Sequence, residues 1–406
     1  MINGREIALL TERMRRVHEA GGTPALVTLL HVKGSAYRRP GSKMLVTPDG
    51  ATTCMISGGC LEQELAELAE GVIESGRARR VHYDLNEDEV WGLGLGCGGE
   101  IDLVIEAAPA GSPVSEWVQM QARGLRAVST LRLSDDGLSR SVVRAGTEPD
   151  DNGDPGGVSA GAVGRGRVEG DPVAAGVPGY GPDVGDPVTR RALQILRGGE
   201  ARSRLERVGE SGERVFFDIS LPPINLVLFG GGPDAVPLAR YAADIGWAVT
   251  VVDPRAEIAT REAFPRATIV QAHPPEFSDN VAIGENSVVV IMNHHLERDR
   301  ESLRFALAHS PAYIGLLGPY SRFETLVAAL EREGDAPSEE ALSRVHTPVG
   351  LDIGAEGPEE IAVSVLSEVL MLSRGHRGGQ LSHKRGAIHE RDTGNQEQGV
   401  SENGNQ

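Results

Sequence analysis

The sequence is poor in lysine and aromatic residues, and it has no long apolar run. Aromatic residues make up 4% of its 406 residues, and its lysines are Lys33, Lys43 and Lys384. No apolar segment reaches the length that spans a bilayer, and the N-terminus has no charged-then-apolar signal. We therefore expect a soluble, cytoplasmic protein with no membrane partner.

Positive charge is also scarce. The chain carries 40 Lys plus Arg against 58 Asp plus Glu, which gives a formal net charge of −18. A chain of this charge repels nucleic acids and anionic lipid surfaces. We therefore expect no nucleic-acid partner.

Cysteine is rare and confined to the first quarter of the chain, at Cys54, Cys60 and Cys97. An odd count without a secretion signal argues against a disulfide framework. The spacing also matches no standard zinc pattern. The three thiols can equally be small buried hydrophobes.

Length and composition predict several domains. Residues 1–145 read as an N-terminal mixed α/β domain, and residues 225–374 as a Rossmann-type parallel-sheet domain. Between them, residues 146–188 are rich in Gly, Pro and Asp without any period, which predicts a disordered insert or, alternatively, a folded Gly-rich β-arm. Residues 189–224 are expected to form a connecting helix and hairpin. Residues 375–406 are polar and predicted to be disordered.

Hydrophobic periodicity places the elements of the N-terminal domain. The expected helices and strands are a helix at 4–21, strands at 25–32, 43–47 and 51–56, a helix at 61–74, strands at 80–85 and 100–107, a helix at 114–123, and a hairpin of 127–133 with 139–144.

A nucleotide-binding βαβ unit is predicted over Leu226–Asp253, which reads as strand, glycine turn, helix and second strand. Gly230 allows a tight turn, Gly232 lets the backbone approach a pyrophosphate, and Ala235 allows close helix packing. Asp253 ends the second strand, where an acid binds a ribose diol and repels the 2′-phosphate of NADP. The alternative is a Rossmann-like domain that keeps the turn and binds no dinucleotide.

Two loops of the N-terminal domain carry candidate chemistry. Gly34–Met44 places two arginines, a lysine and hydroxyls between glycines, which suits an anionic ligand; the alternative is a turn with a solvated basic tip. In Ile56–Glu62, Cys60 is expected at or next to a helix N-cap, where the helix dipole favours a thiolate. Such a thiol can attack, carry sulfur or face a metal, and the alternative is a buried structural cysteine. A similar loop at Gly94–Glu100 can bring Cys97 near Cys60.

Two later segments have competing interpretations. His294 and His295 follow a predicted buried strand, where histidines commonly cap or pack, yet strand carboxyl ends are also where such sheets bind ligands. Gly354–Glu360 places a proline and acids in a first helical turn, which is a normal helix start that needs no ligand.

Several motifs together resemble the XdhC/CoxI family of xanthine dehydrogenase accessory factors. They are the glycine-rich βαβ unit and the runs GSAYRRPGSKMLV, ISGGCLE, GLGCGGEIDLVIE, YIGLLGPYSR and PVGLDIGAEGPEEIAVSVLSEVL. The resemblance implies a maturation factor that binds the molybdenum cofactor (molybdopterin), holds it while a cysteine desulfurase sulfurates it, and delivers it to a molybdenum hydroxylase apoenzyme. It also implies a Rossmann domain that takes NAD, a pterin dinucleotide or no ligand. We further expect a homodimer.

The family motif maps onto two sets of residues. In the first domain these are Gly34, Ser35, Arg38, Gly41, Lys43, Gly58, Gly59, Cys60 and Glu62. In the second they are Gly230, Gly232, Asp253, His294, Asp299, Gly315, Gly318, Arg322, Gly350, Asp352, Ile353, Gly354, Pro358 and Glu360. The insert is not part of the family pattern, and Asn293 stands where a threonine is more usual, so its role is open.

From these residues we expect a cofactor-handling chaperone in which Cys60 contacts molybdenum. The alternative is an NAD(P)-dependent oxidoreductase in which His294 acts as acid and base beside a nicotinamide. A third possibility is a redox or nucleotide sensor that binds a partner protein. The two N-terminal loops discriminate between these functions, because a dehydrogenase has no need of both.

Overall fold

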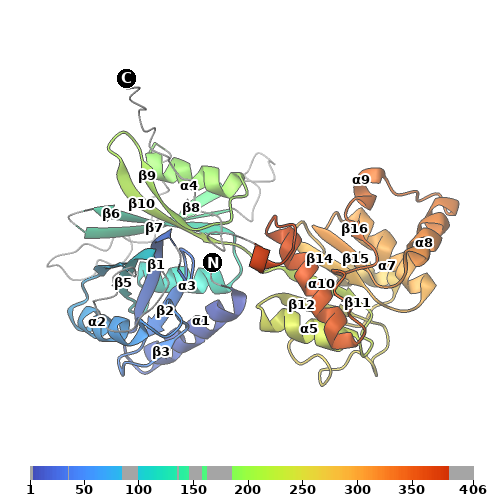
Figure 1. Ribbon diagram of the computed structural model, residues 1–406, viewed down its shortest axis with the longest axis horizontal. Helices are drawn as coiled ribbons and strands as arrows, with labels where there is room; N and C mark the ends of the chain where they lie inside the picture. Colours follow the sequence, from blue (N-terminus) through green and yellow to red (C-terminus); the bar gives the residue numbers. More distant parts are fainter. Residues whose placement is uncertain are drawn as a thin grey trace. The chain divides into compact units, whose positions relative to one another are not determined.

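The computed structural model describes residues 3–34, 36–84, 99–134, 137–145, 158–161 and 185–383. They fall into two compact units, shown in Figure 1: Ile7–Leu221 belongs to the first unit, and Pro222–Gly379 together with Asn3–Glu6 to the second. Within the described residues, no helix is long and apolar enough to cross a membrane.

The first unit contains two antiparallel sheets. Sheet A has the order β3-β2-β1-β5-β4. Its strands are β1 (Ala25–Gly34), β2 (Lys43–Val46), β3 (Thr52–Thr53), β4 (Arg79–Asp84) and β5 (Gly99–Ala107). Strand β3 is shorter than the predicted strand over 51–56 because Cys54 adopts a left-handed φ of 65° and turns the chain away.

Sheet B has the order β8-β7-β6-β10-β9. Its strands are β6 (Ala127–Ser134), β7 (Gly137–Ala145), β8 (Val158–Gly161), β9 (Arg204–Val208) and β10 (Glu213–Ser220). The segment 189–224 contains a helix and the hairpin β9–β10, as expected. This hairpin belongs to sheet B, because β10 pairs with β6 over seven residues. Within the predicted disordered insert the structure describes β8, which pairs with β7; residues 146–157 and 162–184 lie outside the described residues.

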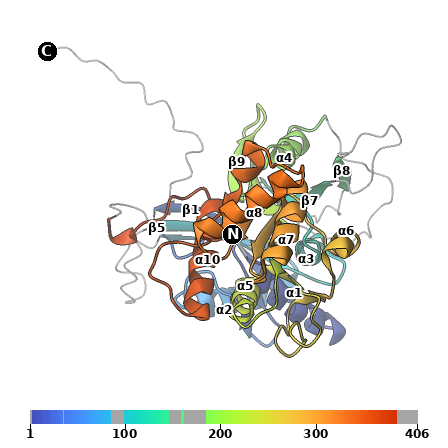
Figure 2. The ribbon, with the colours of Figure 1, turned by 90° about the vertical axis from the view of Figure 1, so that its right-hand side faces the viewer.

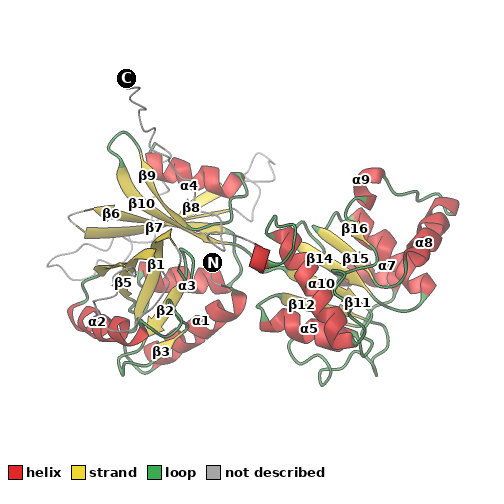
Figure 3. Ribbon diagram, viewed as in Figure 1, coloured by secondary structure: helices red, strands yellow, loops and turns green. Residues whose placement is uncertain are grey.

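Helices cover these sheets on defined faces, as Figure 3 shows. The helices of this unit are α1 (Gly4–Glu19), which belongs to it from Ile7 onward, α2 (Glu62–Ser75), α3 (Pro113–Ala122) and α4 (Pro187–Arg197). Leu65 and Val72 of α2 pack on one face of sheet A, and α4 packs on the outer face of sheet B. The other face of sheet A meets sheet B through an apolar cluster that includes Leu30, Val104 and Phe216.

The second unit is built on a parallel sheet, sheet C, with the order β13-β12-β11-β14-β15-β16. Its strands are β11 (Asn225–Phe229), β12 (Ala248–Val252), β13 (Thr268–Val270), β14 (Ser287–Ile291), β15 (Tyr313–Leu316) and β16 (Val345–His346). In chain order this is 3-2-1-4-5-6, the doubly wound Rossmann arrangement. The predicted fold class, a mixed α/β domain followed by a Rossmann-type domain, is confirmed.

Both faces of sheet C are covered, as its uninterrupted apolar strands require. The helices are α5 (Ala235–Asp244), α6 (Phe277–Asn280), α7 (Leu296–Ala308), α8 (Tyr320–Arg332), α9 (Glu339–Leu342) and α10 (Pro358–Ser373), with short 3₁₀ turns η1 (Pro274–Glu276) and η2 (Leu381–His383). Helices α5 and α10 pack on one face, and α7 and α8 on the other, which Figures 1 and 2 show from two directions.

Candidate functional site

The structure brings the two predicted N-terminal loops together. The Nε of Arg38 donates to the carbonyl oxygen of Met55 at 3.2 Å. The ring of Tyr37 lies over Gly58, where an added Cβ would be 3.5 Å from the ring carbons. Tyr37 is 65% exposed, so a flat aromatic face is presented beside the cysteine loop. The sequence analysis did not single out Tyr37; its place in the first loop, between Gly34 and Gly41, is the signal that could have done so.

The carboxylate of Glu62 holds the second loop in place. Its Oε1 accepts from the amides of Ile56 (2.9 Å) and Ser57 (2.8 Å), and its Oε2 accepts from the Ser57 hydroxyl (2.6 Å) and the Gly59 amide (2.8 Å). Burial alone would raise the pKa of the Glu62 carboxyl, but these hydrogen bonds hold it below its ordinary value. Three amides of this loop, those of Ile56, Ser57 and Gly59, are therefore bound within the chain itself.

Cys60 is presented outward by this loop. Its backbone amide donates to Ser57 Oγ at 3.1 Å, and its side chain is exposed. It lies one residue before Leu61, the N-cap of α2, close to the predicted position. Cys54, in contrast, is half-buried and packs against the cluster of Leu10 and Met14. The alternative of a buried structural cysteine therefore describes Cys54 and not Cys60; Cys97 and Ser35 lie outside the described residues.

Lys43 differs from its expected role. Its side chain is 0% exposed, and its Nζ lies 2.7 Å from Asp218 Oδ2 and donates to the Gly41 carbonyl at 3.0 Å. Trp117 Nε1 donates to the same Asp218 oxygen at 2.7 Å. Complete burial lowers the pKa of the Lys43 ammonium, and the attraction of Asp218 opposes that effect. Because the ammonium points into the space between the sheets, Lys43 supports the loop rather than facing a ligand.

Gly34 and Gly41 of the first loop are required by the backbone conformation or by the space available. Gly41 has a φ of 90°, and a Cβ there would approach Ser203 Oγ to 2.7 Å. Gly34, with a φ of 83°, ends β1 opposite Gly99. Both residues therefore shape the loop. Of the two arginines of this loop, Arg38 contacts the second loop through Met55.

In the second unit, the loops after β11 and β14 meet at the point where the strand order reverses. A Cβ on Gly230 would lie 2.5 Å from the carbonyl oxygen of Met292. Gly230 also has a φ of 112°, so only glycine fits the turn. This is the crevice in which doubly wound sheets bind their ligands.

Asp253 is turned into the glycine loop rather than toward a ribose. It is 0% exposed, and its Oδ2 accepts from the Gly231 amide at 2.8 Å. Arg255 binds the same carboxylate through Nε (2.9 Å), Nη2 (2.7 Å) and its backbone amide (2.9 Å). Burial alone would raise the pKa of the Asp253 carboxyl, but the bonds from Arg255 and Gly231 hold it below its ordinary value. The predicted ribose contact is therefore not available in this conformation.

His294 forms an ion-pair geometry with Asp234, a residue that the sequence motifs did not single out. His294 Nε2 lies 2.6 Å from Asp234 Oδ2, and His294 is held at a left-handed φ of 55°. Such a backbone is costly for a residue with a Cβ, so the surrounding structure must impose it. Asp234 Oδ1 is buried with no hydrogen-bond partner among the described residues. An acid and a histidine thus meet at the carboxyl edge of sheet C.

A buried network fixes the loop that carries His294. Asp299 is 1% exposed and accepts from the backbone amide and side-chain amide of Asn293, both at 3.1 Å. Arg322 Nε donates to the other Asp299 oxygen at 3.0 Å. The open question about residue 293 has a structural answer: Asn293 supplies two bonds that anchor the loop.

The segment around Asp352 is shaped by glycine and by helix capping. A Cβ at Gly350 would lie 2.3 Å from Ser364 Oγ, whereas Asp352 is exposed. Pro358 stands in the first turn of α10, and Glu360 accepts from the Gly357 amide. The interpretation of this segment as a normal helix start is confirmed. Within the described residues, no group of three or more His, Cys, Asp or Glu side chains is arranged to hold a metal ion.

Comparisons with known proteins agree with these motifs. Residues 17–84 match the family model of the XdhC and CoxI family, and residues 226–369 match that of the XdhC Rossmann domain. A Bacillus subtilis (strain 168) protein described as a probable xanthine dehydrogenase subunit is 30% identical over 352 residues, which cover 86% of this chain and 93% of that protein. The molybdenum cofactor insertion chaperone PaoD of Escherichia coli (strain K12) is 25% identical over 355 residues, covering 86% of this chain and 83% of PaoD.

The fold is similar to a solved structure as well. The crystal structure of a xanthine dehydrogenase from Bacillus halodurans aligns with a TM-score of 0.67 at 27% identity, covering 92% of this chain and 97% of that one. With matches to the models of both domains and a relative at 30% identity over most of both chains, the chain belongs to the XdhC and CoxI family.

Proposed function

We propose that this protein binds the molybdenum cofactor as cargo and passes it to the apoenzyme of a molybdenum hydroxylase such as xanthine dehydrogenase. The observation that carries this proposal is the exposed Cys60 on a loop that Glu62 holds rigid. The likeness of the chain to PaoD, a molybdenum cofactor insertion chaperone, supports the same function.

The residues around Cys60 suit the chemistry of that cargo. Molybdopterin combines a flat pterin, a phosphate and a metal bound by sulfur, and thiolate is a fitting ligand for such a metal. Cys60 offers the thiol, and the exposed Tyr37 ring offers a stacking surface. Because the loop amides are bound to Glu62, we assign phosphate recognition to the guanidinium of Arg38 and not to the amides.

We also propose how the cargo is sulfurated and delivered. A thiol held outward is accessible to a second protein, which suits transfer of sulfur from a cysteine desulfurase to the bound cargo. Delivery then requires contact with the hydroxylase apoenzyme. We propose that the protein acts as a homodimer in the cytoplasm.

Replacement of Cys60 by alanine tests the proposal. We expect the variant to lose retained molybdenum cofactor, measured by the fluorescence of the oxidised pterin extracted from purified protein, and to lower the activity of a co-expressed molybdenum hydroxylase. Global stability should change little, because an exposed side chain contributes little packing. Cys54→Ala is the matched control, since it removes a half-buried thiol from the same unit. Unchanged cofactor retention in Cys60→Ala would contradict the proposal.

A second candidate function is favoured by the pair of His294 and Asp234. A histidine bound to a carboxylate at the ligand edge of a Rossmann sheet is placed for proton transfer. This supports an NAD(P)-dependent oxidoreductase. Replacement of His294 by Gln would abolish such an activity, yet leave cofactor retention by Cys60 intact, so the two functions can be separated.

A further inference from the structure

One end of the space between sheets A and B is polar, because side chains alternate along the strands. On β4, Val81 and Tyr83 pack with the cluster under α2, so Arg80 and His82 point to the opposite face, toward sheet B. On β5, Asp102 points to the same face as Arg80 and His82, since its neighbours Ile101 and Leu103 pack under α2.

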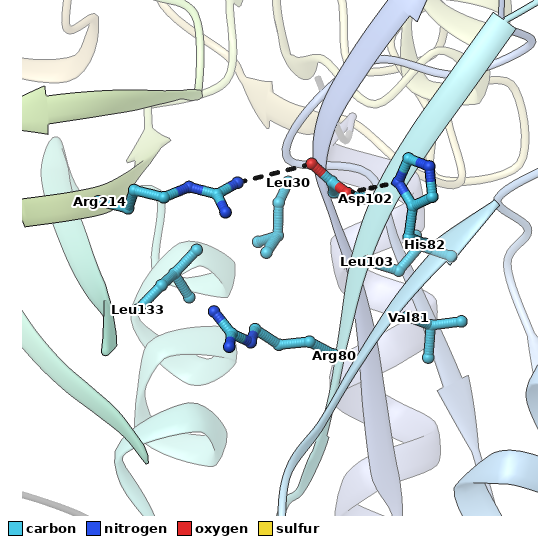
Figure 4. A pocket seen from close by; sticks show the side chains of 8 residues that line it. All are labelled: Leu30, Arg80, Val81, His82, Asp102, Leu103, Leu133 and Arg214. Atoms are coloured by element: carbon cyan, nitrogen blue, oxygen red, sulfur yellow. Dashed lines mark hydrogen bonds and ion pairs between the residues drawn. The ribbon is translucent and has the colours of Figure 1, made fainter. Parts of the chain in front are cut away.

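These side chains line a pocket of about 200 Å³ between the two sheets. Figure 4 shows Arg80 entering it from β4 and Arg214 from β10 on the other side, with Leu30 and Leu133 between them. The remaining lining residues are Val81, His82, Asp102 and Leu103. The pocket therefore has an apolar floor and two guanidinium groups at its sides. It lies on the face of sheet A opposite α2, and the Cys60 loop is not among its lining residues.

The charges in this pocket are only partly balanced. Among the described lining residues the one carboxylate is Asp102, which accepts from His82 Nδ1 at 2.8 Å and lies 3.7 Å from Arg214 Nη2. Arg80 makes no ion pair with any described residue. A pair 3.7 Å apart that is partly exposed contributes little. The guanidinium groups of Arg80 and Arg214 can therefore both still bind an anion. An anion that bridges them gains two charge-assisted contacts.

We propose that this pocket binds a small phosphate ester with an apolar body, independently of the site at Cys60. Arg80 and Arg214 bind the phosphate, and the leucine side chains take the apolar part. The volume lies below the range of about 300–1,000 Å³ that accommodates drug-sized ligands, which limits the body to roughly one ring.

Calorimetric titration of the full chain with phenyl phosphate tests the proposal. We expect a dissociation constant of about 1 mM or lower, weakened at least about tenfold in both Arg80→Ala and Arg214→Ala, because each removes one charged contact. Inorganic phosphate should bind about tenfold more weakly than phenyl phosphate, since it leaves the apolar floor unused.

Arg79→Ala is the matched control. Arg79 is the neighbouring residue on β4 and acts on the other face of sheet A, the face that α2 covers. Burial raises the pKa of the Tyr83 phenol on that face, and the positive charge of Arg79 partly opposes this rise. The control should bind phenyl phosphate within about twofold of the unaltered chain, because it keeps both guanidiniums of the pocket. Equal weakening in Arg79→Ala and Arg80→Ala would overturn the proposal, as would no binding of phenyl phosphate by the unaltered protein. Cys60→Ala should leave this binding unchanged, and weakening there would overturn its independence from the cofactor site.

Discussion

Two glycine loops in this molecule are each organised by one carboxylate of the chain, with different results. Glu62 is partly exposed and accepts from the amides of Ile56, Ser57 and Gly59, and Cys60 projects outward from the loop that it holds. Asp253 is fully buried, takes one amide of the loop after β11, and is covered by Arg255. The Glu62 carboxylate therefore fixes a loop that presents the Cys60 side chain to solvent. The Asp253 carboxylate is instead bonded within the chain at the position where a Rossmann domain would bind a ribose.

Removal of Asp253 should have the largest effect on stability. Asp253→Ala leaves the buried Gly231 amide without an acceptor and Arg255 without its ion-pair partner. We expect the free energy of unfolding of the second unit to fall by about 3 kcal/mol or more, measured by urea denaturation.

An acid on the same unit provides the control for that measurement. Asp352 is exposed, so Asp352→Ala should change stability by less than about 0.5 kcal/mol. A loss in Asp253→Ala no larger than in the control would show that the buried carboxylate is dispensable to the loop.

Removal of Glu62 should have a smaller and more local effect. Glu62→Ala frees the amides of Ile56, Ser57 and Gly59 in a loop that water can reach, so solvent replaces part of what is lost. We expect a cost of about 2 kcal/mol and a loss of hydrogen-exchange protection at these amides. Cofactor retention should fall with it, because Cys60 would no longer be held in place. Retained protection in Glu62→Ala would mean that other contacts set the loop.

Local sequence signals predicted some of these features and missed others. The Rossmann-type parallel fold of the second unit and the start of α10 were predicted from local signals, namely the glycine turn at Gly230 and the proline at 358. The roles of Lys43 and Asp253 could not be predicted in this way, because both side chains are buried against partners that tertiary packing supplies. The buried Lys43 pairs with Asp218, which lies on a strand far along the chain, and no local sequence pattern indicates that partner. For the same reason the predicted connector 189–224 was not assigned to sheet B, whose pairing of β6 with β10 is non-local.

Acid should loosen the Cys60 loop, with a smaller effect than the removal of Glu62. The pKa of Glu62 is held below the ordinary carboxyl value of 4.5, so its contribution to stability is fully present above that pH and is lost as pH falls through the lowered pKa. We expect the protection of the Ser57 and Gly59 amides to decline below about pH 4.5, measured by hydrogen exchange corrected for intrinsic rates. Glu62→Gln should show no such decline, because it does not titrate. A decline of the same size in Glu62→Gln would assign the effect to another group.

The smallest expected effect concerns dinucleotide choice in the second unit. The sequence predicted that Asp253 repels the 2′-phosphate of NADP, but the group that reaches solvent at the end of β12 is the guanidinium of Arg255, whose side chain is 37% exposed. If the crevice takes a dinucleotide, an arginine there accommodates the 2′-phosphate. We therefore expect calorimetry to show tighter binding of NADP than of NAD, and Arg255→Ala to reverse that order by about tenfold in relative affinity. The variant both removes the cation and releases the Asp253 oxygens toward a ribose diol. Preference for NAD in the unaltered protein would show that Asp253 turns outward when a nucleotide binds, and would restore the role that the sequence predicted for it.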